Sequence, residues 1–104
     1  ELMGFGMTSD SKDMGNPDAA LDASDIDYLN AHGTGTVIND RNETNAIKRV
    51  FKNQAQHLAI SSTKSMYGHP LGAGGGIEAI VCIKSIGDHW VPPTVNLHEA
   101  DCEC

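Results

Sequence analysis

The sequence predicts an α/β fold, and three of its features lead to this prediction. A short apolar run at 57–60 has the length of a buried strand. It leads through a polar loop into a Gly-rich helix start and an apolar helix that ends at Ile86. An alternating segment at 25–31 leads in the same way into a second Gly-rich loop and an amphipathic helix. Strands that alternate with helices are typical of α/β proteins, so we expect one small α/β domain over residues 1–104.

Local patterns set the bounds of each expected element. Leu2, Phe5 and Met7 give the first segment the apolar character of a strand. Asp40 and Glu43 have the spacing of a capping box, which places the start of a helix at Asp40. In chain order, strands are expected at 1–7, 25–31 and 57–62, and helices at 40–52 and 71–86.

Charge and composition exclude several classes of partner. The net charge of −7 argues against nucleic acid and against an anionic membrane surface. No apolar run approaches the roughly 18 residues of a transmembrane helix, so no membrane span is expected. No signal peptide is recognised, and a chain that starts at Glu1 is expected to be a processed or excised piece.

The three cysteines indicate reduced thiols. Cys102 and Cys104 are too close in sequence to bridge comfortably, and Cys82 lies in the apolar helix. This usage favours a cytoplasmic setting. Cys82 is expected to be a packed core residue and not a nucleophile.

The polar loop after the 57–62 strand carries the first group of candidate site residues. Glu78 follows this loop among apolar neighbours, and a buried carboxylate is costly unless it is paired. Lys64 is the nearest plausible cation, and His69 lies between them in the chain. A purely structural ion pair would give the same pattern, so these residues alone leave a catalytic and a structural role open.

The loop after the 25–31 strand carries the second group. His32 follows the strand end, and glycines beside it allow the backbone to turn sharply. The hydroxyls of Thr34 and Thr36 could bind a polar ligand or simply satisfy a turn, and the pattern alone does not decide between these interpretations.

The two loops together resemble a known family. The segment at 28–36, Tyr-Leu-Asn-Ala-His-Gly-Thr-Gly-Thr, resembles the first histidine motif of β-ketoacyl-acyl-carrier-protein synthases. The segment at 61–69, Ser-Ser-Thr-Lys-Ser-Met-Tyr-Gly-His, resembles their lysine and second histidine motif. Segments at 71–79 and 92–97 extend the match to nearly all of 25–97, and the chain-elongating, discrete type of ketosynthase is the most similar.

The resemblance implies a thiolase-like fold, of which this chain would be part of the C-terminal half. The family consists of acyltransferases of fatty-acid or polyketide-type synthesis, which condense malonyl thioesters with an acyl-enzyme by decarboxylative Claisen chemistry. The implied partners are acyl carrier protein, malonyl and acyl thioesters, the missing N-terminal half and a second copy in a homodimer. No cofactor is implied beyond the phosphopantetheine of the carrier protein, whose arm Thr34 and Thr36 would bind. No metal is implied.

The resemblance also assigns catalytic roles. By position, His32 and His69 are the two histidines that hydrogen-bond the thioester oxygen through Nε2 and so stabilise the enolate. Lys64 is the family lysine, and Glu78 is the carboxylate that orients it.

The chain also departs from the family pattern. The nucleophilic cysteine of the family lies in the N-terminal half, and the glycine-rich C-terminal gating loop is absent as well. The family usually carries a long helix between residues 9 and 25, of which only 14–21 remains here, so either a segment was lost or the chain joins separate pieces. We therefore expect the chain to be inactive alone. Three alternatives stay open at this point: a non-catalytic chain-length partner subunit, another thiolase-like condensing enzyme, or an unrelated α/β module that binds phosphate through its Gly loops.

Overall fold

A computed structural model describes residues 22–102 and 104, so the strand expected at 1–7 lies outside the described residues. Three of the elements are short 3₁₀ helices, at Ala23–Asp25, Lys52–Gln56 and Leu71–Ala73. The strands and α-helices are β1 (Tyr28–Asn30), α1 (Val37–Phe51), β2 (Ala59–Ser61), α2 (Lys64–Tyr67) and α3 (Gly74–Asp88).

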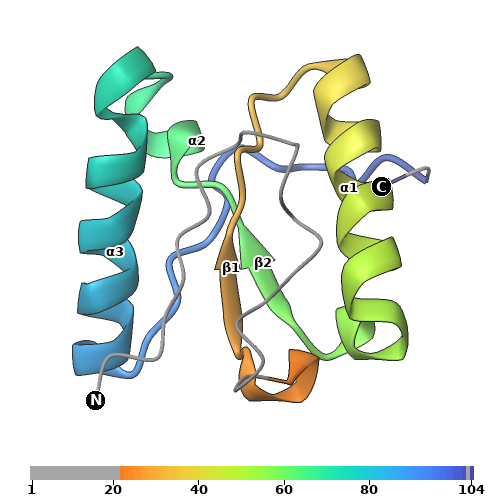
Figure 1. The fold of residues 1–104 in the computed structure, drawn as a ribbon. Helices are drawn as coiled ribbons and strands as arrows, with labels where there is room; N and C mark the ends of the chain where they lie inside the picture. The colour runs from red at the N-terminus through yellow and green to blue at the C-terminus, as the bar shows by residue number, and fades with distance from the viewer. Residues whose placement is uncertain (1–21, 103) are drawn as a thin grey trace.

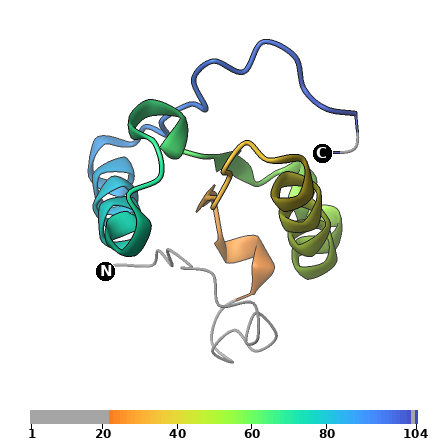
Figure 2. The ribbon, with the colours of Figure 1, turned by 90° about the horizontal axis from the view of Figure 1, so that it is seen from above.

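The centre of the fold is a parallel pair of strands. β1 and β2 pair with Leu29 opposite Ile60. Parallel strands need a crossover connection, and α1 supplies it between β1 and β2. α1 lies on one face of the pair and α3 on the other (Figures 1 and 2), so the described chain has three layers, helix, sheet and helix.

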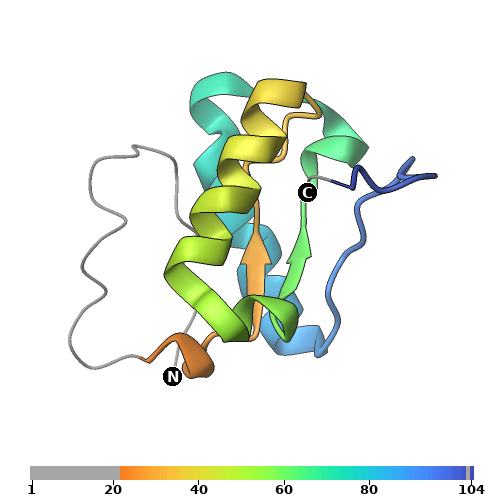
Figure 3. The ribbon, with the colours of Figure 1, turned by 90° about the vertical axis from the view of Figure 1, so that its right-hand side faces the viewer.

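The chain after α3 is extended and returns along the outer edge of β2 (Figure 3). Two hydrogen bonds attach it there. The Ser62 amide donates to Thr94 Oγ1 at 3.0 Å, and the Val95 amide donates to Ser65 Oγ at 2.9 Å. This segment therefore lies against the loop that follows β2.

The expected elements that fall within the described residues are present, with shifted bounds. The two strands lie within 25–31 and 57–62 but are shorter. The helix expected at 71–86 divides into a 3₁₀ turn and α3, and the short helix α2 was not expected.

The predicted capping box at Asp40 and Glu43 is wrong. α1 begins three residues earlier, at Val37, and Thr36 with its extended backbone occupies the N-cap position. Asp40 is therefore already inside the helix. The carboxylates of Asp40 and Glu43 accept hydrogen bonds from amides of the preceding loop and not from the helix end that a capping box would satisfy.

The apolar core is small, and α3 is only partly covered. Side chains from different layers are buried, among them Ile47 of α1 and Leu58 before β2, each 7% exposed. On α3, by contrast, Ile80 is 62% exposed and Ile83 is 49% exposed. Exposed isoleucines in adjacent turns form the kind of surface that normally packs against other protein.

We predict that the 104-residue chain expressed alone forms assemblies larger than a monomer, because its α3 surface is apolar and a chain this short buries a modest fraction of its area. Replacing Ile80 and Ile83 together by lysine should shift the chain toward monomer in size-exclusion chromatography with light scattering. Ile47→Lys is the control, since a charge at a buried position should unfold the chain instead. A wild-type monomer with a sharp, cooperative thermal transition would contradict the prediction.

Candidate active site

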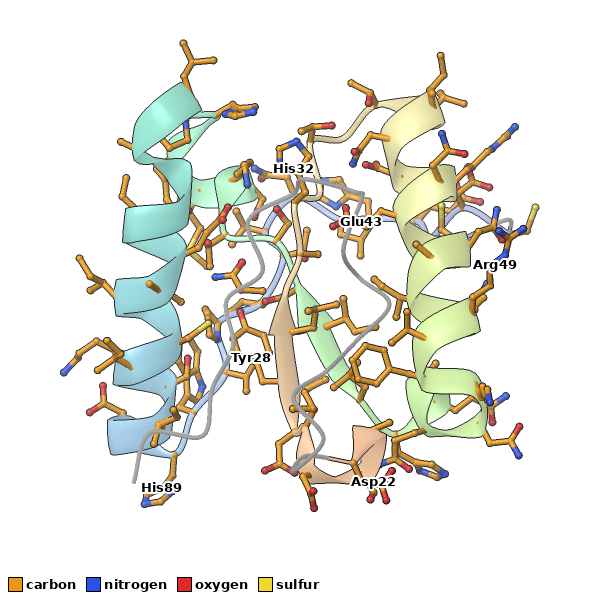
Figure 4. The ribbon with its side chains drawn as sticks, in the orientation of Figure 1. Asp22, Tyr28, His32, Glu43, Arg49 and His89 are labelled. Carbon is orange, nitrogen blue, oxygen red and sulfur yellow. The ribbon has the colours of Figure 1, made fainter. Side chains whose placement is uncertain are left out.

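The candidate site lies where the two parallel strands end. The carboxyl ends of β1 and β2 share one edge, so the loops after them emerge side by side. His32 comes from the first loop and His69 from the second (Figure 4 labels His32). Their ring centroids are 5.2 Å apart with an interplanar angle of 83°. The fold thus brings together two imidazoles that are far apart in sequence.

His69 is fixed through its own ring. Its Nδ1 accepts a hydrogen bond of 3.0 Å from the amide of Leu71. A ring nitrogen that accepts carries no proton, so the neutral imidazole of His69 bears its proton on Nε2. The Leu71 backbone that makes this bond has φ of +51°, which is unusual for a residue other than glycine.

Glu43 fixes the loop of His32. From α1, its Oε1 accepts the His32 amide at 2.7 Å and its Oε2 accepts the Gly33 amide at 2.8 Å. The side chain of Asn39 donates to the same carboxylate at 3.2 Å. Charge-assisted hydrogen bonds of this length are strong, so the carboxylate holds two successive peptide groups in one position.

Sequence reasoning missed this role of Glu43. Glu43 lies within the range 25–97 that the resemblance covers, but the capping interpretation directed its carboxylate to the wrong amides. The signal available in the sequence was a pair of acidic residues just after a Gly-rich loop that must satisfy several backbone amides.

The expected partner of Glu78 is Lys64. Lys64 begins α2 and Glu78 lies in the second turn of α3, and Nζ of the lysine contacts Oε1 of the glutamate. Their side chains are 5% and 9% exposed. Two charges removed from water are tolerated because each compensates the other, and the pair ties α3 to the segment that carries His69.

A partly buried set of side-chain hydrogen bonds joins the two strand ends. The side-chain amide of Asn30 donates to Thr63 Oγ1 at 3.1 Å, and the Thr63 hydroxyl lies 2.9 Å from that of Tyr67. Tyr28 OH and Ser61 Oγ are also 2.9 Å apart. Burial raises the pKa of Tyr28, although the bond with Ser61 opposes the shift, so this phenol stays protonated.

The hydroxyls of Thr34 and Thr36 lie 3.1 Å apart at the exposed end of the first loop. They come from the same loop as His32, but no described contact tests whether they bind a ligand. Their role stays a prediction.

Cys82 has the environment of a structural residue. It lies one turn beyond Glu78 on α3 and is 9% exposed. Burial raises its pKa, and the nearby Glu78 charge raises it further, so the reactive thiolate is disfavoured. Cys102 and Cys104 are exposed and free.

Within residues 22–102 and 104, no group of three or more His, Cys, Asp or Glu side chains could hold a metal ion. No described helix is long and apolar enough to cross a membrane.

The two adjoining histidines thus lie at the carboxyl ends of parallel strands, and the buried Lys64–Glu78 pair holds the segment that carries one of them. The family model of the β-ketoacyl synthase C-terminal domain matches residues 2–98, and the chain therefore belongs to this family. The expected fold class, part of a thiolase-like α/β domain, is thereby confirmed. The unrelated phosphate-binding module is not favoured.

Individual proteins that are similar to this chain support the assignment to the family. Nodulation protein E of Rhizobium sp. strain N33 is 45% identical over 118 aligned positions, which cover 100% of this chain and 29% of that protein. Nodulation protein E of Rhizobium meliloti is 55% identical over 87 positions, covering 84% of this chain and 22% of that protein. The 3-oxoacyl-[acyl-carrier-protein] synthase 2 of Staphylococcus aureus strain COL is 44% identical over 120 positions, covering 100% of this chain and 29% of that protein.

The chain spans less than a third of the length of these relatives. The alignments of 118 and 120 positions also exceed the 104 residues of the chain, so two of the relatives carry residues with no counterpart here. This agrees with the expectation that a segment usual in the family is missing from the chain.

The buried ion pair gives a prediction about stability in the complete protein. Lys64→Ala should lower the free energy of unfolding by about 3–5 kcal/mol, because it leaves Glu78 charged and buried without a partner. Replacing Lys64 by Met and Glu78 by Leu together should recover part of this loss. Lys84→Ala is the matched control, since it breaks the exposed pair with Asp88 on the same helix and should cost less than about 1 kcal/mol. If denaturant titration showed that the double variant is no more stable than Lys64→Ala, the assigned pairing of Lys64 with Glu78 would be wrong.

The thiols give a second prediction. Iodoacetamide should modify Cys102 before Cys82, and Cys82 should react only when the protein is unfolded, because its thiolate is disfavoured by burial. Because the pKa of Cys82 is raised in the folded state, its contribution to the free energy of unfolding is fully present below the pKa of the unfolded state. That contribution declines as pH rises through the pKa of the folded state. Mass spectrometry after timed alkylation measures the order, and fast modification of native Cys82 at neutral pH would contradict it.

Proposed function

We propose that the complete protein is a β-ketoacyl-acyl-carrier-protein synthase, an acyltransferase that catalyses decarboxylative Claisen condensation in fatty-acid or polyketide-type chain elongation. The observation that carries this proposal is the short distance of 5.2 Å between the ring centroids of His32 and His69. The His69 tautomer also presents Nε2–H as a hydrogen-bond donor. We assign the same donor role to His32, and two such donors can bind one oxygen that becomes negatively charged during a reaction.

In the proposed reaction, malonyl thioester binds with its thioester oxygen toward His32 and His69. The bond between its α-carbon and carboxylate breaks, and carbon dioxide leaves. The electron pair forms an enolate whose charge rests on the thioester oxygen, where the histidine donors stabilise it. The enolate carbon then attacks the acyl carbonyl carried on a cysteine, a new carbon–carbon bond forms, and the sulfur leaves as thiolate.

Other parts of the proposal concern groups around the histidines. Lys64 and Glu78 would be supporting members of the site, since their buried pair fixes the segment that carries His69. Thr34 and Thr36 would hydrogen-bond the pantetheine arm of acyl carrier protein, which is rich in amides. The nucleophilic cysteine would come from the N-terminal half of the protein. The protein would need no further cofactor, form a homodimer and act in the cytoplasm.

The test is made in the complete protein, with malonyl-carrier decarboxylation and acyl transfer to the cysteine measured separately. His32→Ala and His69→Ala should each lower the decarboxylation rate by about 10²–10³, because each removes one donor to the developing oxyanion. Acyl transfer should fall less, since it does not form that enolate.

The matched control is His57→Ala, an exposed histidine before β2 at the opposite edge of the sheet, which should leave both rates unchanged. Decarboxylation that survives both site substitutions would refute the role of the histidines. A wild-type protein that lacks the nucleophilic cysteine and does not transfer acyl groups would instead identify a non-catalytic partner subunit.

A further inference from the structure

His32 and His69 are held in different ways. The ring of His69 is fixed directly by the amide of Leu71. The imidazole of His32 makes no hydrogen bond to any other residue that the structure describes, and it packs against the His69 ring in a T-shaped arrangement. The hydrogen bonds that hold His32 are therefore those of its backbone.

Hydrogen bonds hold the peptide groups around His32 from two sides. On the amide side, Glu43 accepts the N–H groups of His32 and Gly33. On the carbonyl side, the Ser62 hydroxyl donates to the oxygen of Gly33 at 2.9 Å and lies 3.4 Å from the oxygen of His32. Ser62 is 6% exposed, so water cannot readily replace this donor.

Ser62 is also in tight steric contact with the His32 loop. Gly33 has φ of +41°, and a Cβ added there would lie 2.3 Å from Ser62 Cβ and 2.7 Å from its Oγ. Only glycine at this position lets the two loops approach so closely. The loop of His32 therefore lies directly on Ser62.

Ser62 itself is anchored within the second loop. Its amide donates to Thr94 Oγ1 at 3.0 Å, and its carbonyl accepts the Ser65 hydroxyl at 2.8 Å. Lys64 follows two residues later, and the same loop continues to His69. One residue thus connects the His32 loop, the His69 loop and the extended segment along β2.

We infer that Ser62 is a positioning residue that sets the place of the His32 imidazole relative to His69 by fixing the Gly33 carbonyl. The inference rests on the proposed function for its kinetic consequence, but its structural content is independent of that function. Ser62 does not touch the reacting oxygen in this scheme. It acts only through the backbone of the His32 loop.

The test compares Ser62→Ala with Ser85→Ala in the complete protein. Both variants lose one buried hydroxyl, but Ser85 lies on α3, and only Ser62 bonds to the His32 loop. Ser62→Ala should lower kcat for malonyl decarboxylation about fivefold with little change in KM, the effect of one lost neutral hydrogen bond that orients a catalytic group. It should also shift and broaden the NMR signals of the His32 ring. Ser85→Ala should leave kcat within twofold and the His32 signals unchanged.

A second variant pair keeps the inference testable if Ser62→Ala folds poorly. Gly33→Ala should abolish the native His32 signals because the new Cβ collides with Ser62, and adding Ser62→Gly should restore them in part. An active wild type with unaltered kcat and unaltered His32 signals in Ser62→Ala would overturn the positioning role. An inactive wild type whose His32 signals still move in Ser62→Ala would refute the proposed function and leave the positioning role standing.

Discussion

The buried ion pair between Lys64 and Glu78 is the interaction on which the arrangement of this chain depends. It joins the start of α2 to the second turn of α3, and both charges are almost completely removed from water. An ion in such surroundings is tolerable only opposite its partner, so the pair allows one relative position of the two helices. The loop of His69 runs between them, and its ends are fixed as a result.

The histidines occupy their positions because the fold satisfies backbone groups and not only side chains. The parallel pairing of β1 and β2 brings both loops to one edge. Glu43 then supplies acceptors to the amides of one loop, while the Asn30–Thr63 bond joins the ends of the two strands. In the proposed reaction such a site would be preorganised, because its donors would need little rearrangement when charge develops on a substrate.

Much of this arrangement could be predicted from the sequence, and the exceptions have a common cause. The strands at 25–31 and 57–62, the helix at 71–86 and the Lys64–Glu78 pairing follow from periodicity and from the cost of a buried carboxylate. The start of α1 and the partners of Glu43 do not, because a capping pattern and a loop-binding carboxylate have the same spacing in the sequence. Ser62 was missed for a related reason, since its role depends on how closely two distant loops approach, which no local pattern records.

The left-handed backbone of Leu71 has a further consequence. A residue with a Cβ is destabilised by about 1–2 kcal/mol in that region, and here the side chain is also 79% exposed, so it gains little by packing. A glycine would relieve the strain, but it would also make many other backbone conformations available to the loop. The chain therefore gives up stability at a site where a restricted backbone keeps the Leu71 amide aimed at His69 Nδ1. A substitution of Leu71 that relieved the backbone strain would therefore weaken the control of the His69 tautomer.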